Sequence, residues 1–226
     1  MSLHSVEAAL RAIRAGEFVV VADDEDRENE GDLIIAAEAA TTEKLAFMLR
    51  HTSGVVCVGI TPWRATELAL PLMVAENSEP QRTQFTVSVD LASGISTGIS
   101  AADRSRTIRA LGNRRVGADA FLRPGHVFPL RARPNGVLER QGHTEAAVDL
   151  ARLAGFEPAG ALCELMADDG SMLRGVELVQ FAARHGLPHL HIGDLVAYRR
   201  ATERRPLLGV AQDALERHYL LPEVHA

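Results

Sequence analysis

The sequence predicts an α/β or α+β layered domain, because stretches with helical periodicity alternate with short apolar runs along the chain. No repeat, low-complexity tract or linker interrupts this alternation. With 226 residues, of which 46% are hydrophobic, the chain can bury a full core without disulfides. We therefore expect one domain over residues 1–205, followed by a C-terminal tail over residues 206–226.

The N-terminal part predicts an amphipathic helix that Gly16 ends, and then two buried strands at 18–21 and 33–35. Residues 23–32 would form the loop between these strands. Caps, proline positions and apolar runs then predict, in order, a helix at 42–50, a strand at 54–60, a helix from Pro62, an irregular segment at 71–83, a strand at 84–90, a Gly/Ser/Thr-rich loop at 92–100, a helix at 101–111 and a strand near 127–130.

The C-terminal part predicts a helix at 144–153, a strand at 161–166, a helix at 175–184 and a short strand at 189–192. The tail after Arg200 carries apolar residues that would pack either on the core or on a second subunit. Its pattern leaves both choices open.

Composition narrows the class of protein. The two cysteines, Cys57 and Cys163, are far apart and outside any CxxC pattern, so we expect neither a zinc site nor a disulfide framework. The chain has no signal-peptide core and no apolar run of membrane-spanning length, which predicts a cytoplasmic protein with no membrane contact. The net charge of −6 argues against a general nucleic-acid partner.

The acidic stretch from Asp23 to Asp32 carries seven carboxylates in ten residues. Such a loop repels itself unless water screens the charges or a cation neutralises them, and carboxylate oxygens suit Mg²⁺ or Mn²⁺. An EF-hand is excluded, because Asn29 stands where that calcium loop needs glycine. A solvated acidic turn is the alternative, although the flanking Val-rich and Ile-rich runs favour a site.

Two short motifs place a histidine directly after a glycine, ending at His126 and His143. The second motif lies where a helix begins, so its free amides and positive dipole end would bind a phosphate, and Arg140 would add a bidentate contact. His143 would then reach a metal beside that anion. Either histidine alone is more often structural than catalytic.

Glu164 interrupts an apolar strand, and a carboxylate there is costly unless it is paired or functional. It is therefore a candidate acid or base, and a salt bridge to arginine is the equally open alternative. The loop from Ser93 to Arg106 is a candidate second anion cradle at a helix start. It lacks the lysine of a P-loop.

Together these segments resemble the 3,4-dihydroxy-2-butanone 4-phosphate synthase family of riboflavin biosynthesis. The resemblance runs from residue 5 to about 200. The segments that carry it are VVVADDEDRENEGDLIIAAE (19–38), RHTSGVVCV (50–58), QFTVSVD (84–90), GISTGISAADRSRTIRAL (94–111), RPGHVFPLRARPNGVLERQGHTEAAVDLARLAG (123–155) and LCELMADDGSM (162–172).

The resemblance implies a single three-layer domain with a mixed β-sheet flanked by helices, and a lyase that converts ribulose 5-phosphate to 3,4-dihydroxy-2-butanone 4-phosphate and formate. It implies two Mg²⁺ or Mn²⁺ ions held by Glu28 and His143, with His126 and Glu164 essential to catalysis. The residues expected to bind the substrate are Arg27, Glu28, Asp32, Arg140, Gln141, Gly142, His143, Thr144 and Glu164.

The family also implies a homodimer whose active sites form where the subunits meet. Many relatives are fused to a GTP cyclohydrolase II domain whose zinc site needs three cysteines, and the end of this chain has none, so we expect a monofunctional enzyme. Two alternatives remain: another metal-dependent phosphosugar lyase, isomerase or phosphatase, and a non-enzymatic acidic module. Formate release distinguishes the synthase from both.

Overall fold

The computed structural model describes residues 3–203, so the predicted tail at 206–226 lies outside the described residues. Within 3–203 a seven-stranded sheet forms the centre, in the order β4-β5-β3-β6-β2-β1-β7. Its strands are β1 (Val19–Ala22), β2 (Gly31–Ala36), β3 (Cys57–Ile60), β4 (Val89–Leu91), β5 (Phe121–Arg131), β6 (Ala159–Glu164) and β7 (His189–His191).

The sheet is mixed, as expected. β1 pairs with β7 and β3 pairs with β5 in parallel, while the other neighbouring strands run antiparallel. The central strands are buried on both faces, which explains why β1 and β2 read as continuous apolar runs rather than as alternating patterns.

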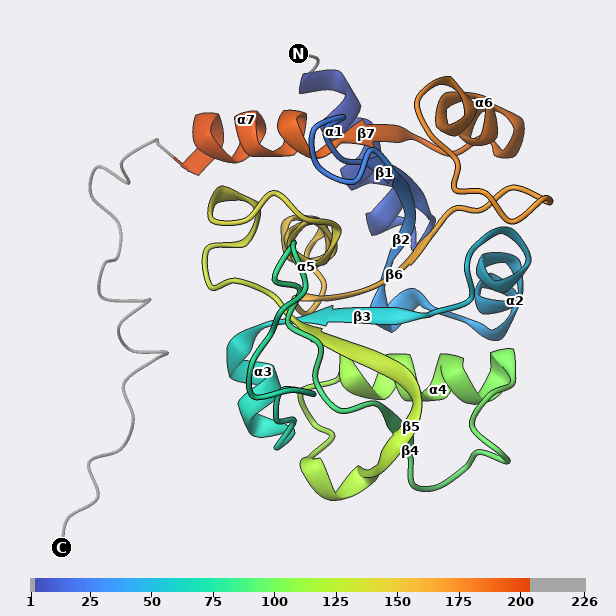
Figure 1. Cartoon of the computed structure of the whole chain (residues 1–226), viewed down its shortest axis with the longest axis vertical. Helices are drawn as coiled ribbons and strands as arrows, with labels where there is room; N and C mark the ends of the chain where they lie inside the picture. Colours follow the sequence, from blue (N-terminus) through green and yellow to red (C-terminus); the bar gives the residue numbers. More distant parts are fainter. Residues whose placement is uncertain (1–2, 204–226) are drawn as a thin grey trace, which may run out of the picture.

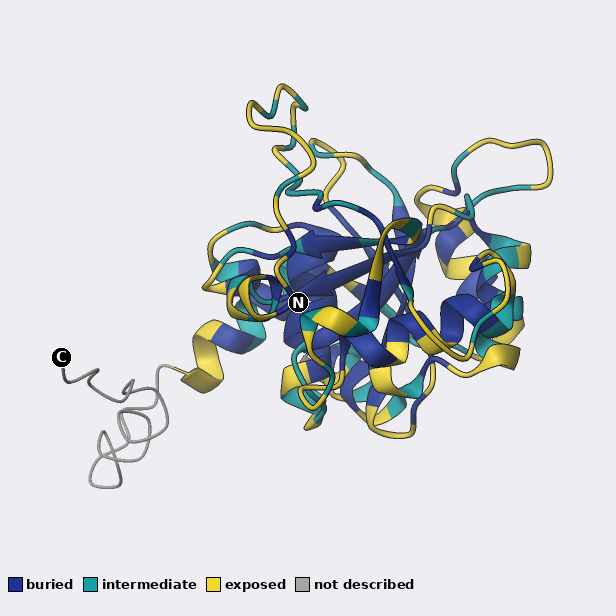
Figure 2. Cartoon of the chain, turned by 90° about the horizontal axis from the view of Figure 1, so that it is seen from below, coloured by how far each residue is buried: buried dark blue, intermediate teal, exposed yellow. Residues whose placement is uncertain are grey.

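Helices cover both faces of the sheet and complete three layers (Figure 1). One face packs against α1 (Leu3–Arg14), α5 (His143–Ala154) and α7 (Ile192–Glu203). The other face packs against α2 (Thr42–His51), α4 (Ala101–Leu111) and α6 (Val176–His185), and the short α3 (Pro62–Glu67) borders the same core. Figure 2 shows the buried residues gathered in the sheet and on the inner sides of these helices.

The local signals that predicted the helices act as expected. Thr41, Thr61 and Ser100 each accept a hydrogen bond from the backbone N–H three residues later, at the starts of α2, α3 and α4. None of the helices in residues 3–203 is both long enough and apolar enough to cross a lipid bilayer.

Several strand predictions were wrong in extent. β3 covers Cys57–Ile60 instead of 54–60, and β6 covers Ala159–Glu164 instead of 161–166. The strand expected at 84–90 is regular only at β4, because Phe85 and Thr86 make isolated bridges to two different segments instead of a continuous ladder. The strand near 127–130 is longer, since β5 covers Phe121–Arg131.

Helix α7 was not predicted. Its core-facing residues are Ile192, Leu195, Val196 and Arg199. Because the last of these positions holds an arginine instead of an apolar residue, the sequence does not show the helical period of apolar residues. The buried Arg199 is neutralised by Asp149, with 2.8 Å between Arg199 Nη1 and Asp149 Oδ2.

Candidate active site

The register of the sheet brings three distant segments together. Asp32 on β2 is directly opposite Glu164 on β6 and, on its other side, opposite Val21 on β1. The first turn of α5, beginning at His143, packs over the same ends of these strands. The acidic loop, the end of β6 and the start of α5 therefore surround one point, although they are far apart in sequence.

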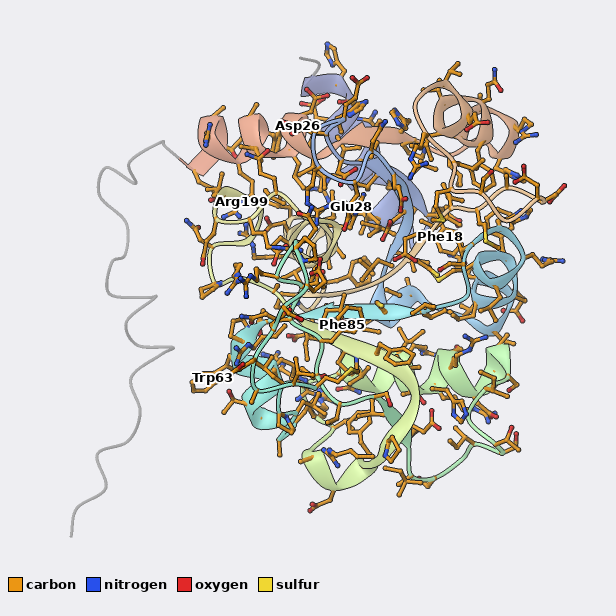
Figure 3. The ribbon with its side chains drawn as sticks, in the orientation of Figure 1. Phe18, Asp26, Glu28, Trp63, Phe85 and Arg199 are labelled. Carbon is orange, nitrogen blue, oxygen red and sulfur yellow. The ribbon has the colours of Figure 1, made fainter. Side chains whose placement is uncertain are left out.

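The acidic loop folds around the buried carboxylate of Asp23. Asp23 Oδ2 accepts from Arg27 Nη1 at 2.6 Å and from the backbone N–H of Glu28, and Asp23 Oδ1 accepts from the backbone N–H of Glu30 at 2.9 Å. Glu28 lies at the edge of the cavity, and its side chain also accepts from Arg27 at 2.7 Å. Asp26 lies on the outer side of the loop (Figure 3).

The imidazole of His143 is buried and held by the backbone of β1. Its Nε2 lies 3.2 Å from the carbonyl oxygen of Val21, so Nε2 carries the proton and donates it to that oxygen. Its Nδ1 faces two carboxylates, at 3.7 Å from Glu28 Oε2 and 3.7 Å from Asp32 Oδ1. A backbone bond on one ring nitrogen commonly orients the other nitrogen toward a metal.

Burial and charge shift the acid–base behaviour of this group. Burial raises the pKa of Asp32 to about 7, even though the nearby His143 opposes the rise. Burial alone would lower the pKa of His143, but Asp32 and Glu28 outweigh it and raise that pKa to about 9. The nearby His143 and the charge of Arg27 lower the pKa of Glu28 against its burial.

These residues form a donor set that fits a divalent metal. Asp23, Glu28 and His143 each offer one ligand atom, and the three atoms lie within 4.8 Å of one another. Asp32 Oδ1 is buried and, among the described residues, has no hydrogen-bond partner. A buried carboxylate oxygen without a donor is costly, and a cation nearby removes that cost. Hard oxygens with one imidazole suit Mg²⁺ or Mn²⁺.

A cavity of about 250 Å³ opens beside this donor set. Nearly all of the expected substrate-binding residues line it, together with Glu79, Thr83 and Phe85 from the region around the segment predicted to be irregular. The expected substrate-binding residues that line the cavity are Arg27, Glu28, Asp32, Arg140, His143, Thr144 and Glu164. A larger hollow of about 790 Å³ beside α4 is lined by several arginines but holds no comparable donor set among the described residues.

Glu164 contributes a carboxylate to the cavity wall. Its Oε2 accepts from the hydroxyl of Ser53 at 2.7 Å. Among the described residues no arginine lies within ion-pair distance of Glu164, so these residues do not supply the salt bridge that was the alternative. Its other oxygen, Oε1, has no hydrogen bond to a described residue.

The start of α5 keeps its first amides free, because the N-cap Gly142 has no side chain to accept from them. Arg140 stands beside this turn and donates from Nη1 to Glu145 at 2.6 Å and from Nη2 to Thr83 Oγ1 at 2.8 Å. Two of its five N–H donors thus remain, one on each terminal nitrogen, after the bond from Nε to Gln81 is counted. Gln141 is exposed and does not line the cavity.

His126 is the one expected catalytic residue that the fold does not bring to this cavity. It lies on β5 beside β4, where its Nδ1 is 2.6 Å from Asp90 Oδ2, and it does not line the cavity. Its side chain is 43% exposed, so it faces outward from the chain.

The loop expected to be a second anion cradle is already filled by an acid. Asp103 accepts from the hydroxyl and the backbone N–H of Ser96, at 2.7 and 3.1 Å, and from the backbone N–H of Gly98 at 3.2 Å. Chiefly the Ser96 hydroxyl lowers the pKa of Asp103 to about 2. The anion-cradle prediction is therefore wrong, because the protein supplies the anion itself.

Sequence reasoning missed several lining or supporting groups. Asp23 was one of seven acids with nothing to single it out, and Ser53 gave no signal. Both cysteines line the cavity, on adjacent strands β3 and β6. Burial raises the pKa of Cys163 to about 11 and that of Cys57 well above its usual value, so both thiols stay protonated at neutral pH.

Comparisons with known proteins show the family of the chain. Residues 7–198 match the family model described as 3,4-dihydroxy-2-butanone 4-phosphate synthase. A protein of that name from Photorhabdus laumondii is 55% identical over 204 residues, which cover 90% of this chain and 94% of that protein. The riboflavin biosynthesis protein RibBA of Salinispora arenicola is 56% identical over 201 residues, covering 89% of this chain and 48% of that protein.

Among solved structures, a 3,4-dihydroxy-2-butanone 4-phosphate synthase in complex with two magnesium ions is similar to this chain. It superimposes with a TM-score of 0.86 at 48% identity, covering 88% of this chain and 97% of that one. The three-layer fold is thus shared over nearly the whole of that protein.

Proposed function

The chain belongs to the 3,4-dihydroxy-2-butanone 4-phosphate synthase family, and we propose that the cavity between the acidic loop, β6 and α5 is its active site. The enzyme acts in riboflavin biosynthesis and converts ribulose 5-phosphate to 3,4-dihydroxy-2-butanone 4-phosphate and formate. One observation carries the proposal: the sheet register places Asp32 opposite Glu164, and α5 adds His143 to the same cavity.

The divalent ions of this family fit the donor set. A structural relative holds two magnesium ions, and here Glu28 and His143, with Asp23, offer the oxygen and nitrogen donors that Mg²⁺ or Mn²⁺ accepts. When bound, the ions supply positive charge that stabilises negative charge developing on substrate oxygens. The unpartnered oxygen of Asp32 adds a further donor to the site.

The phosphate of the substrate is bound at the start of α5. The free amides of His143 and Thr144 and the positive end of the helix dipole favour an anion there. Arg140 and Arg27 line the same cavity and add positive charge. Gln141 and Gly142 lie beside this turn, and Gly142 supports the binding by leaving the amides uncapped.

Two groups move protons in the reaction. Glu164 exchanges a proton at Oε1, because Oε2 is held by the Ser53 hydroxyl. His126 exchanges a proton at Nε2, because its Nδ1 faces Asp90. Removal of the proton next to the ketose carbonyl gives an enediol, which then loses water. After a carbon migrates, water adds to C4 and C4 leaves as formate, and these steps need several proton transfers within one site.

The outward position of His126 supports a homodimer with shared sites. Its ring faces outward, and the exposed apolar side chains of Ile99 and Leu122 lie near it on the loop before α4 and on β5. Leu122 is the register partner of Asp90, and Gly98 abuts both Asp90 and His126. An apolar rim around an outward histidine fits a second copy of the chain, which would carry His126 to the partner's cavity.

Mixed dimers test this arrangement. Co-expression of His126→Ala and Glu164→Ala chains is expected to restore formate release, because each mixed dimer has one site with both residues intact. Preparations of either variant alone are expected to be inactive. Mixed dimers as inactive as the single variants would contradict the shared site.

Three further proposed properties concern activity, location and domain organisation. The chain has a single activity, since both of its cysteines line this cavity and none is left for a cyclohydrolase zinc site. Two buried free thiols fit a cytoplasmic location, where thiols stay reduced. The continuous sheet within residues 3–203 supports one catalytic domain over 1–205.

The activity is tested with ribulose 5-phosphate as the substrate. We expect one formate released for each ribulose 5-phosphate consumed, only with Mg²⁺ or Mn²⁺ present. An isomeric sugar phosphate or free inorganic phosphate as the sole product would identify a different phosphosugar enzyme. No turnover together with tight nucleic-acid binding would favour the non-enzymatic module.

A further inference from the structure

A large bulge in the sheet places His126 against Asp90. Val89 on β4 pairs with Val127, but the next residue, Asp90, pairs with Leu122, so residues 123–126 are looped out of β5 between these two pairs. Bulges of this kind re-aim a side chain near active sites. Here the bulge sets the backbone of His126 beside the carboxylate of Asp90.

Asp90 holds both the backbone and the ring of His126. Its Oδ1 accepts from the backbone N–H of His126 at 2.9 Å, and its Oδ2 lies 2.6 Å from His126 Nδ1. The side chain of Asp90 is only 9% exposed, whereas that of His126 is 43% exposed. The carboxylate of Asp90 is thus buried, whereas the other ring nitrogen of His126, Nε2, is on the exposed side of the ring.

Two glycines make this arrangement possible. A Cβ on Gly125 would lie 2.0 Å from the backbone carbon of Val89 and 2.2 Å from the nitrogen of Asp90, so no larger residue fits before the histidine. A Cβ on Gly98, whose φ is +92°, would lie 2.1 Å from Asp90 Oδ2 and 2.6 Å from His126 Nδ1. The loop before α4 therefore packs directly against both Asp90 and His126.

The bond to Asp90 selects the tautomer of the ring. An ionised carboxylate only accepts hydrogen bonds, so Nδ1 must carry a proton and Nε2 keeps its lone pair in the neutral ring.

We propose that Asp90 is a positioning residue for the reaction, which fixes the orientation and the tautomer of His126 so that Nε2 exchanges protons with substrate. This role rests on the proposed function of His126 as an acid or base. Asp90 itself does not touch the substrate.

The test compares Asp90→Asn with the matched control Asp119→Asn, an exposed aspartate of the nearby turn before β5 with no side-chain partner among the described residues. The amide that Asp90→Asn introduces donates to Nδ1 and moves the ring proton to Nε2. We expect kcat for formate release to fall by about 10²–10⁴-fold, the range of acid–base catalysis, with KM changed far less. Asp119→Asn is expected to behave as wild type.

Nuclear magnetic resonance of ¹⁵N-histidine-labelled protein supplies a measurement independent of activity. The His126 resonances are expected to report a proton on Nδ1 in the wild type and on Nε2 in Asp90→Asn. In a His126→Asn background, Asp90→Asn is expected to cause no additional loss of kcat. An additional loss there, or an unchanged tautomer, would overturn the positioning role.

A second pair of variants tests the contact between the loop before α4 and the Asp90–His126 pair. Gly98→Ala places a methyl group against both members of the pair, whereas Gly94→Ala, also at positive φ in the same loop, has no atom within 4 Å of the added Cβ. We expect Gly98→Ala to lose kcat and Gly94→Ala to lose only stability. Equal kcat for these two variants would count against the proposal. Absence of formate from the wild type itself would instead refute the proposed function.

Discussion

Gly59 on β3 and Gly160 on β6 are register partners, and both face helix α5 at backbone contact. A Cβ on Gly59 would lie 2.7 Å from the carbonyl oxygen of Thr144, and one on Gly160 would lie 2.7 Å from that of Ala147. Because neither glycine has a side chain, α5 can approach the sheet closely. This approach brings His143 within reach of Asp32 and Glu28.

Replacing Gly59 by Ala is therefore expected to push the first turn of α5 away from the sheet. Overpacking of this kind costs about 1–3 kcal/mol of unfolding free energy, and we expect metal affinity to fall as His143 moves. Urea denaturation and calorimetric Mg²⁺ titration measure the two effects. Gly117→Ala, where an added Cβ meets nothing within 4 Å, is the control. Equal stability of the two variants would contradict the close approach.

Glu28 is one of the proposed metal ligands. We expect Glu28→Gln to weaken Mg²⁺ binding and to lower kcat/KM by at least about 10²-fold, since an anionic ligand is lost. Asp26→Asn, on the exposed outer side of the same loop, removes equal charge and is expected to have little effect. Formate assays at a series of Mg²⁺ concentrations compare the two variants. A similar loss in both variants would indicate a general charge effect instead of a site.

Metal removal is expected to abolish activity without unfolding the protein. The core of the chain is formed by the two apolar clusters on the faces of the sheet, which do not depend on the ligands. Dialysis against EDTA followed by far-ultraviolet circular dichroism and a formate assay checks both statements, and added Mg²⁺ or Mn²⁺ should restore turnover. Loss of helical signal in EDTA would show that the metal also supports the fold.

The ion pair between Arg140 and Glu145 is expected to set substrate affinity. Glu145 is 1% exposed and also accepts from the backbone N–H of Arg133. Hydrogen bonds to charged groups contribute about 1.5–3 kcal/mol, so Glu145→Gln should raise KM for ribulose 5-phosphate roughly 10-fold or more while kcat changes less. Steady-state kinetics with the exposed Glu7→Gln as control test this expectation. A fall in kcat alone would assign Glu145 to another role.

Asp103 predicts a pH dependence of stability. Its folded pKa is about 2, mainly through the Ser96 hydroxyl, while an unfolded aspartate titrates near 3.9. A depressed pKa contributes stability that is complete above the unfolded value and is lost as pH falls toward the folded value. Ser96→Ala should therefore be less stable than wild type at pH 7, and the difference should shrink between about pH 4 and pH 2. Urea midpoints at several pH values measure it. A constant difference over this range would exclude the linkage.

Most elements could be predicted from the sequence because their signals are local. Gly16 ends α1 at positive φ, Thr41 and Ser100 cap their helices, and the apolar runs at β1 and β2 are buried as expected. The prediction failed at α7, where Arg199 occupies a core position and is neutralised by a residue from another helix. No local pattern reports a partner so distant in the chain.

The candidate site, too, could be predicted from the sequence only in part. The sequence singled out Glu28, His143 and Glu164, and the fold brings all three to one cavity. It could not distinguish Asp23 among seven acids, because only the folded loop shows which carboxylate is buried. It also assigned the loop before α4 to an external anion, whereas the fold fills that loop with Asp103.

By itself, then, the sequence determined the order of helices and strands, the chemistry of the acidic stretch and the resemblance to a family, since each depends on residues near one another in the chain. Only the tertiary structure decided which side chains share a cavity and which face outward. Strand pairing sets Asp32 against Glu164, and the bulge between β4 and β5 sets His126 against Asp90. Register depends on non-local pairing, and a shift of one residue would turn each of these side chains to the other face of the sheet.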